Sequence, residues 1–338
     1  RFTSDWFFLL SIFIGIILAT STVASAPIYL RAIERLALEK TIDDLSRPFS
    51  NIHTFIFNMS ATQETVRKTE TAINAATHNH LFTIYESRNR YLTPRTWLLG
   101  TPSNPLLSSR SGDSAASHGY FRSFTNIEQN VNFLFGRMAT SEVEEGPRGP
   151  IVESIVSLTS AKLFDLNVGD LVEMAKSIDD RLIFTIKIVG IVDPINPMAD
   201  FWQLNAALML DPGTSLNTGD DVVDGTAESE PILPLFITQD ALIDSINSVY
   251  PGTLIGSLWF TMVSVERLKE LSLLEIQESL RGYENELSRL LPGSEVNTGI
   301  YTMATDFETR RFFYRVTLLL LLTSVVSVIL FYLVLTTS

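Results

Sequence analysis

Two long uncharged apolar runs lie near the two ends of this 338-residue chain. The first is Trp6–Ala26 and the second is Val316–Leu335, and neither contains Asp, Glu, Lys or Arg. At about 1.5 Å per residue, a helix of about twenty residues is long enough to cross a bilayer core of roughly 30 Å. We therefore predict a transmembrane helix in residues 1–26. In residues 305–338 we predict a stalk helix that continues into a second transmembrane helix.

A secretory signal peptide is the alternative for the first run, because Ala24-Ser25-Ala26 has the small-x-small form of a cleavage site. The run is longer than the apolar core of roughly 7–15 residues that is typical of signal peptides. Pro27 would directly follow the cut and suits cleavage poorly. These two observations favour a retained helix, which places both chain ends on one side of the membrane.

The segment between the two runs is acidic, and the whole chain has a net charge of −13. Such a charge argues against a nucleic-acid partner. The chain has no cysteine, which excludes disulfides and thiolate metal sites. The acidic loop 211–231 offers carboxylates that calcium could use, but their spacing matches no EF-hand, so we interpret it as a solvated surface loop. No cofactor or metal is predicted.

Periodicity predicts an α+β domain of mixed sheets and long helices in residues 48–304, divided into two α/β subdomains. A helical stalk over residues 27–47 is expected to connect it to the first apolar run. The main expected elements are strands over 49–57, 151–156, 181–192 and 258–263, a loop over 101–118, and helices over 61–91, 157–166, 238–249 and 265–291.

The helix expected over 265–291 carries apolar residues at steps of three and four, which is a heptad-like stripe. The stripe consists of Leu273, Ile276, Leu280, Tyr283, Leu287 and Leu290. Packing against the domain's own sheet is the favoured interpretation. A helix of a partner or a neighbouring subunit is the alternative.

The residues from Phe135 to Pro197 contain a sequence of small motifs. Gly136-Arg137 comes first, then a strand, a short helix, Gly169-Asp170, and a strand that ends near Gly190. This order, between two apolar runs, resembles the extracytoplasmic core domain of FtsX/MacB-type ABC transporter permeases. Permeases of that family have further membrane helices, so the resemblance implies that the chain is a piece of a longer polypeptide.

The resemblance also implies a function and partners. It predicts a permease subunit that couples ATP hydrolysis by a cytoplasmic ABC ATPase to movement of its outer domain, for export or mechanotransmission. It places the chain in the cell membrane as a multi-pass protein, with residues 27–311 outside the cytoplasm. The lipid bilayer and either a second permease half or a second copy of the chain would be further partners.

The helical stalks are expected to act as levers, because an unbroken helix transmits a displacement that a loop would absorb. We predict that Ala32, Leu36, Phe307 and Arg311 take part in this coupling.

No catalytic motif is present: the chain lacks a P-loop, an H-E-x-x-H and a G-x-S-x-G sequence. His78 and His80 would point away from each other on a helix, which disfavours a zinc site. We therefore predict that the chain is not an enzyme. A membrane-anchored extracytoplasmic sensor or receptor domain is the first alternative function, and a tethered adhesion protein is the second.

Overall fold

The computed structural model describes residues 2–94, 96–103, 106, 117–177, 180–213 and 231–337. Most of the predicted acidic loop 211–231 lies outside the described residues, and so does most of the predicted loop 101–118.

The chain divides into two compact units. Unit 1 comprises Arg1–Ser46, Val265–Gln277 and Gly299–Ser338, and unit 2 comprises Arg47–Ser264 and Glu278–Thr298. The helices are α1 (Phe2–Asp43), α2 (Arg47–Ser50), α3 (Gln63–Ala76), α4 (Leu158–Leu163), α5 (Ala206–Leu210), α6 (Gln239–Val249), α7 (Val265–Glu270), α8 (Leu273–Leu290) and α9 (Gly299–Thr337), with the π-helical turn η1 (Thr77–Leu81) and the 3-10 turns η3 (Ile127–Gln129) and η4 (Asp200–Trp202). The strands are β1 (Ile52–Ser60), β2 (Tyr85–Pro94), β3 (Trp97–Gly100), β4 (Ser117–Phe124), β5 (Val131–Gly136), β6 (Val143–Gly146), β7 (Gly149–Ser157), β8 (Leu171–Ala175), β9 (Phe184–Pro194), β10 (Ile232–Phe236), β11 (Leu254–Val263) and β12 (Ser294–Asn297).

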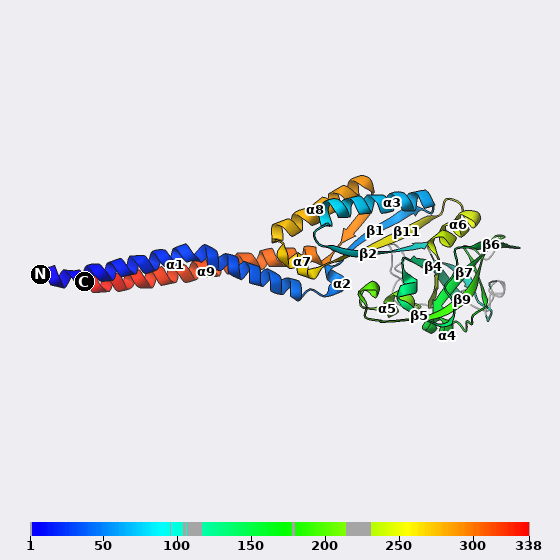
Figure 1. The fold of residues 1–338 in the computed structure, drawn as a ribbon, viewed down its shortest axis with the longest axis horizontal. Coiled ribbons are helices and arrows are strands. Elements are labelled where there is room, and N and C mark those ends of the chain that lie inside the picture. Colours follow the sequence, from blue (N-terminus) through cyan, green and yellow to red (C-terminus); the bar gives the residue numbers. More distant parts are fainter. Residues whose placement is uncertain are drawn as a thin grey trace. The chain divides into compact units, whose positions relative to one another are not determined.

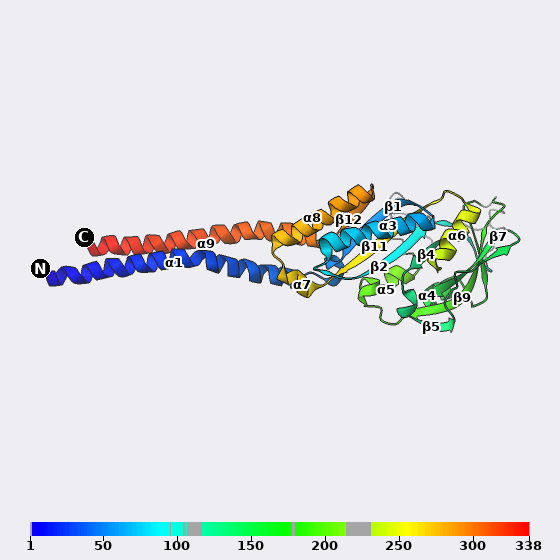
Figure 2. The ribbon, with the colours of Figure 1, turned by 45° about the horizontal axis from the view of Figure 1, so that its top comes forward.

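Unit 1 is built on the two longest helices. Helix α1 has 42 residues and continues through Pro27, and α9 has 39 residues. They run side by side in opposite directions, with both chain ends at the same end of the pair (Figure 1 and Figure 2). The Nε of Arg315 on α9 donates to Oε1 of Glu34 on α1 at 3.0 Å, which joins the two helices.

The predicted transmembrane character of these helices is wrong. A membrane crossing requires about 20 consecutive, predominantly apolar residues in one helix. In the part of the chain that the structure describes, no helix combines the length and the hydropathy needed to cross a membrane. The predicted fold class, an α+β domain flanked by two transmembrane helices, is therefore corrected to a mixed α/β fold.

Unit 2 is organised around one mixed sheet, to which all twelve strands of the described residues belong. The strand order is β10-β7-β9-β8-β3-β4-β2-β11-β1-β12, and β5 and β6 pair with β9 and β7. Strand β10 pairs with β4 as well as with β7, so the strands from β10 to β4 in this order close into a ring. We call these six strands the strand ring, and we call β2, β11, β1 and β12 the four-strand extension.

Strand β4 of the ring connects the two parts, because it pairs with β3 and β10 in the ring and with β2 in the extension. The inner side of the ring is apolar and includes Phe121, Met174, Phe184, Ile186 and Leu235, all of which are buried. Burying apolar area of this kind is the main favourable contribution to folding.

The predicted helix over 61–91 is only partly correct. Helix α3 begins after the N-cap Thr62, whose hydroxyl accepts a hydrogen bond from the backbone N–H of Thr65. The chain then leaves the helix, and residues 85–94 form β2, which pairs along its length with β11. This pairing with a strand more than 150 residues away outweighs the local helical pattern, as tertiary context often does.

The predicted helix over 265–291 is two helices. Ser272 and Glu275 form a capping box between α7 and α8: the Ser272 N–H and hydroxyl each donate to Glu275 at 2.7 Å, and the Glu275 N–H donates to the Ser272 hydroxyl at 3.3 Å. A serine followed three residues later by a glutamate is the sequence signature of a helix start. Five of the six residues of the predicted apolar stripe are buried, and the sixth, Leu290, is exposed. The buried five are Leu273, Ile276, Leu280, Tyr283 and Leu287.

Other predictions are close to the observed elements. Ser157 and Thr238 are the N-caps of α4 and α6, and the strand expected over 181–192 is β9. The expected strand over 49–57 begins later, because residues 47–50 form the short helix α2. Strands β4, β5, β6 and β12 were not predicted.

Candidate functional site

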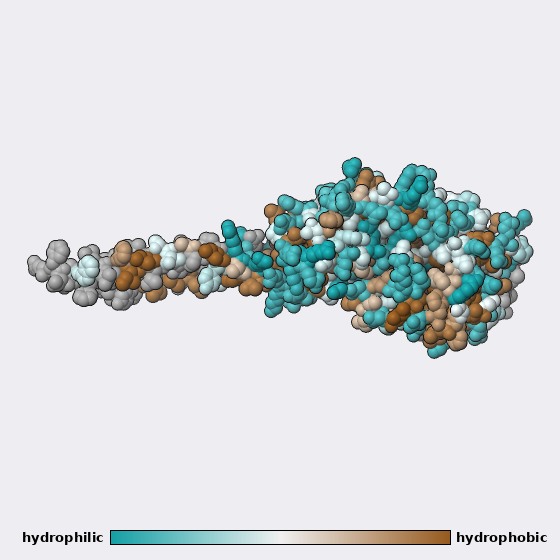
Figure 3. Space-filling model, viewed as in Figure 1, coloured by the Kyte–Doolittle hydropathy of each residue, from teal (hydrophilic) through white to brown (hydrophobic). Residues whose placement is uncertain are grey.

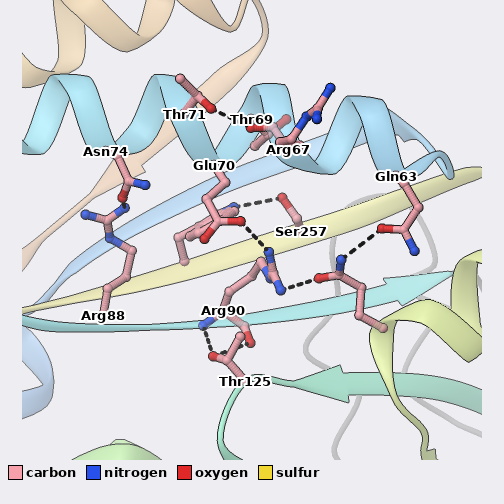
Figure 4. Close-up of polar contacts among 12 residues, drawn as sticks. Gln63, Arg67, Thr69, Glu70, Thr71, Asn74, Arg88, Arg90, Thr125 and Ser257 are labelled. Carbon is pink, nitrogen blue, oxygen red and sulfur yellow. Dashed lines mark hydrogen bonds and ion pairs between the residues drawn. The ribbon is translucent and has the colours of Figure 1, made fainter. Parts of the chain in front are cut away.

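A polar network joins α3, which lies over the four-strand extension, to α6, which packs on the strand ring (Figure 1 and Figure 4). Gln63 donates to Asp240 at 2.7 Å, and Gln239 donates to Gln63 at 3.2 Å. The guanidinium of Arg90 on β2 donates to the side-chain oxygen of Gln239 and lies 3.4 Å from Glu70 of α3. We call these five residues the α3–α6 network.

Arg90 is the centre of this network, and only 9% of its surface is exposed. Its guanidinium carbon lies 5.1 Å from the ring centroid of Trp259, which is within the range of a cation–π contact. Burial lowers the pKa of Arg90, while the negative charges of Glu70 and Asp240 act in the opposite direction. The guanidinium stays charged, because arginine does not lose its proton in proteins.

The backbone of Arg90 is anchored as well. Its N–H donates to the hydroxyl of Thr125 at 3.0 Å, and its carbonyl accepts a bond of 3.0 Å from the N–H of Thr125 (Figure 4). Thr125 directly follows β4, the ring strand with which the extension pairs through β2. The network therefore lies at the junction of the two parts of the sheet. Movement of one part relative to the other would change the distances between the residues of the network.

A surface hollow of about 350 Å³ lies over the network. Its lining combines amides with both signs of charge and consists of Gln63, Glu64, Val66, Arg67, Glu70 and Gln239. The ionisable side chains of this lining are Glu64, Arg67 and Glu70. The arrangement is suited to holding two helices together by hydrogen bonds.

The motif residues predicted from the sequence meet on β9. Gly136 pairs with Gly190 across β5 and β9, and the N–H of Arg137 donates to the carbonyl of Val189 at 2.9 Å. A Cβ on Gly190 would lie 2.4 Å from the carbonyl oxygen of Arg137, and a Cβ on Gly136 would lie 2.0 Å from that of Val189. Gly136 also has a φ of +74°, which favours glycine.

Gly169 and Asp170 reach the same strand from the β8 side. The N–H of Gly169 donates to the carbonyl of Ile188 at 2.7 Å, and the N–H of Ile188 donates to the carbonyl of Asp170 at 2.9 Å. Four motif residues from two separate segments therefore contact a stretch of three residues on β9 that includes the fifth, Gly190.

Arg137 also forms an ion pair that locks this region. Its two terminal nitrogens donate to the two carboxylate oxygens of Glu153 on β7 at 2.7 and 2.5 Å, and Thr140 donates to Glu153 from its N–H and its hydroxyl, both at 3.0 Å. The hydrogen bonds from Arg137, followed by those from Thr140, lower the pKa of Glu153 from 4.5 to about 2. A bidentate Arg–carboxylate pair of this kind is stronger than a hydrogen bond between uncharged groups.

The four predicted coupling residues belong to unit 1, and the structure describes the side chains of three of them. Ala32 and Leu36 lie on an exposed part of α1, where Leu36 is 65% exposed. Phe307 is buried, and the side chain of Arg311 is outside the described part of α9. The packed residues that the sequence analysis missed on α1 are Leu38 and Ile42, four positions apart, as expected for one helix face.

The α3–α6 network was also missed. The sequence of residues 88–90 contained a pattern that predicts a strand here. Two arginines alternate with an asparagine, so the two arginines would lie on one face of the strand. Because a helix was predicted over this segment, the alternation was not interpreted as a strand. Among the described residues, no group of three or more His, Asp or Glu side chains is arranged to hold a metal ion.

Comparisons with known proteins give no assignment, because the chain matches no protein-family model and no curated protein sequence.

Proposed function

We propose that this chain is the permease component of an FtsX/MacB-type ABC transporter, which couples ATP hydrolysis by a separate ATPase to movement of its α/β unit for export or mechanotransmission. The observation that carries the proposal is the antiparallel pair of α1 and α9, which the contact between Arg315 and Glu34 joins. Hydrogen bonding along each helix makes it stiff, so displacement at one end reaches the other end.

Further contacts tie the short segments of unit 1 to this pair. Lys269 of α7 forms an ion pair with Asp43 of α1, and Gln277 of α8 donates to Glu308 of α9 at 3.0 Å. The chain passes between the two units at residues 46–47, 264–265, 277–278 and 298–299. Movement within unit 1 would therefore reach unit 2 through four covalent connections.

The cluster of motif residues on β9 also supports the proposal. Gly136-Arg137, Gly169-Asp170 and Gly190 carry the resemblance to the permease family, and they form one local structure, although they are up to 54 positions apart.

The exposed apolar side chains of unit 1 support a place at the cell membrane. Large apolar side chains are exposed on both long helices, among them Phe13, Ile28, Phe312 and Leu320, each at least 61% exposed (Figure 3). Apolar surface of this extent normally contacts something other than water. We propose that lipid and a second permease half or second copy cover it, that residues 27–311 lie outside the cytoplasm, and that a cytoplasmic ABC ATPase supplies the energy.

The lever can be tested by interrupting a helix of unit 1. We would insert Gly-Gly-Ser after Ala32, and separately after Phe307, in the chain co-purified with its ATPase. The control carries the same insertion after Gly252, which lies in an open turn with a φ of +78°. The readout is the ATP-dependent distance change between labels on Thr71→Cys in α3 and Asp244→Cys in α6, which are specific because the chain has no cysteine.

We expect the two helix insertions to abolish the distance change while ATP hydrolysis continues, and the control insertion to preserve it. An unchanged distance response in both helix variants would contradict the lever. Failure to recover an ATPase with the unmodified chain under mild detergent would contradict the assignment to this transporter class.

A further inference from the structure

The segment that connects β9 to α5 contains two neighbouring residues with a left-handed backbone. Gln203 has a φ of +50° and Leu204 has a φ of +61°. Residues other than glycine, asparagine and aspartate seldom adopt this conformation, because the Cβ approaches the following carbonyl oxygen too closely. Two such residues in succession therefore store strain in residues 199–205, which we call the latch segment.

The latch segment also buries a polar group that has no partner. Trp202 is fully buried, and its ring lies 4.5 Å from that of Phe201 and 6.1 Å from that of Phe124, measured between centroids. Among the described residues, no group accepts a hydrogen bond from the indole Nε1 of Trp202, although buried donors are nearly always paired. Strained residues cluster at active sites, ligand clamps and switch regions. The latch segment therefore has two features that are expected of a switch.

Side chains from residues 47–53, which comprise α2 and the start of β1, hold the latch segment in place. Nη1 of Arg47 donates to Oδ2 of Asp200 at 2.5 Å. Nδ2 of Asn51, a buried residue, donates to Oε1 of Gln203 at 3.1 Å, and Nε2 of His53 lies 3.3 Å from the same oxygen. The side-chain amide of Gln203 in turn donates to the carbonyl of Asp200 at 3.0 Å. These contacts stabilise the strained conformation.

We propose that the latch segment is a conformational switch that movement of α1 releases. The release by α1 rests on the proposed function, whereas the strain does not. Helix α1 ends at Asp43 and α2 begins at Arg47, so only residues 44–46 lie between them. A displacement of α1 would reach Arg47 and Asn51 through this short connection and break their contacts with the latch segment. The stored strain would then favour another backbone conformation.

Release of the latch segment would affect the packing of both parts of the sheet. The segment leads directly into α5, which begins at Ala206. Both Ala206 and Trp202 belong to an apolar cluster that includes Val192 of the strand ring and Phe260 of the four-strand extension. Withdrawal of Trp202 would loosen this cluster. The switch therefore connects movement of α1 to the packing between the strand ring and the extension.

Backbone hydrogen exchange of the full chain tests the contacts that hold the latch segment. The N–H groups of residues 203–206 all donate to carbonyls of residues 197–202, so their protection factors report opening of the segment. Asn51→Ala and Asp200→Ala should each lower these protection factors by roughly two- to tenfold, because each removes one hydrogen bond or ion pair. Protection in β9 should stay unchanged, which distinguishes local release from a general loss of stability.

Arg148→Met is the matched control for these two variants. Arg148 donates to Glu173 at 3.1 Å in an ion pair that is also partly exposed and lies elsewhere in unit 2. Its removal should leave the protection of residues 203–206 unchanged. Unchanged protection of these residues in both Asn51→Ala and Asp200→Ala would overturn the latch.

Leu204→Gly and Leu204→Ala test the strain. Both remove the leucine side chain beyond Cβ, but only glycine adopts a φ of +61° without strain. The protection factors of residues 203, 205 and 206 should therefore be roughly three- to tenfold higher in Leu204→Gly than in Leu204→Ala. Equal protection in the two variants would show that the segment is not strained, and would overturn the switch.

The release by α1 is tested in the chain co-purified with its ATPase. Adenylyl-imidodiphosphate, an ATP analogue that is not hydrolysed, should lower the protection of residues 203–206. Unchanged protection in this complex would overturn the release by α1. The experiments on the chain alone need no ATPase, so their failure is distinguishable from failure of the transporter proposal.

Discussion

Gly136 and Gly190 face each other across β5 and β9 so closely that neither position has room for a side chain. The carbonyl oxygen of Arg137 occupies the place that a Cβ on Gly190 would need, at 2.4 Å. Because a backbone oxygen cannot turn away as a flexible side chain can, the strands themselves must separate to admit even a methyl group.

We predict that Gly190→Ala lowers the free energy of unfolding by about 1–3 kcal/mol, the usual cost of overfilling a packed site. Urea denaturation of the full chain measures this change. Gly256→Ala is the matched control on β11, where the nearest atom to a Cβ would be at 3.6 Å, and it should change stability by less than about 0.5 kcal/mol. Equal stability of the two variants would show that β5 can move away from β9.

The pH dependence of stability should depend on Glu153. Its pKa falls from 4.5 to about 2 on folding, so its contribution to stability is present above pH 4.5 and is lost as the pH falls through about 2. Since Arg137 is 56% exposed, we expect solvent to limit this contribution to about 1–2 kcal/mol.

Glu153→Gln should therefore be less stable than the unmodified chain at pH 7, and the difference should shrink as the pH falls from 5 toward 2. Thermal unfolding at a series of pH values measures the two curves. The stability difference between Arg137→Gln and the unmodified chain should shrink in the same pH range, because this substitution removes the other half of the pair. A difference that stays constant with pH would mean that the pair contributes nothing through ionisation.

The parts of the fold that could be predicted are those with short-range signals. Ser157 and Thr238 mark helix starts, because a cap depends only on the next three residues. The convergence of Gly136 and Gly190 was not visible in the sequence, because 54 positions separate them.

The parts that could not be predicted depend on distant contacts. Arg90 and Trp259 are on neighbouring strands although 169 positions separate them, so no local pattern shows that residues 85–94 form a strand. The closing of the strand ring by β10 and β4 depends on a parallel pairing between residues more than 100 positions apart. On α1, apolar residues surround the helix, so the sequence does not distinguish the exposed Leu36 from the buried Leu38.

The α3–α6 network should depend on the buried guanidinium of Arg90. Arg90→Met keeps a long apolar chain near Trp259, but it leaves the side-chain oxygen of Gln239 without its donor. We expect a loss of about 1–3 kcal/mol in urea denaturation, which is the usual cost of an unsatisfied polar group in a mostly buried place.

Arg67→Met is the control for Arg90→Met. Arg67 lines the same hollow but is exposed, and it lies on α3 away from the network (Figure 4), so its removal should change stability by less than about 0.5 kcal/mol. Hydrogen exchange should also increase in α3 and α6 of Arg90→Met together. An increase in only one of the two helices would contradict the role of the network in joining them.

The last prediction concerns the hydrogen bond between α8 and β1. The hydroxyls of Tyr283 and Thr54 lie 3.0 Å apart, and both residues are fully buried, so α8 is attached to β1 by a hydrogen bond shielded from water. Tyr283→Phe and Thr54→Val should each cost about 1–2 kcal/mol in urea denaturation, since each leaves one buried hydroxyl without this partner.

The double variant separates this contact from the general effects of each substitution. If the two hydroxyls stabilise each other, the double variant Tyr283→Phe with Thr54→Val should lose less free energy of unfolding than the two single variants lose together. We expect the difference to be at least about 0.5 kcal/mol. Additive losses would show that the hydroxyls act independently. In that case this hydrogen bond would contribute nothing to the attachment of α8 to β1.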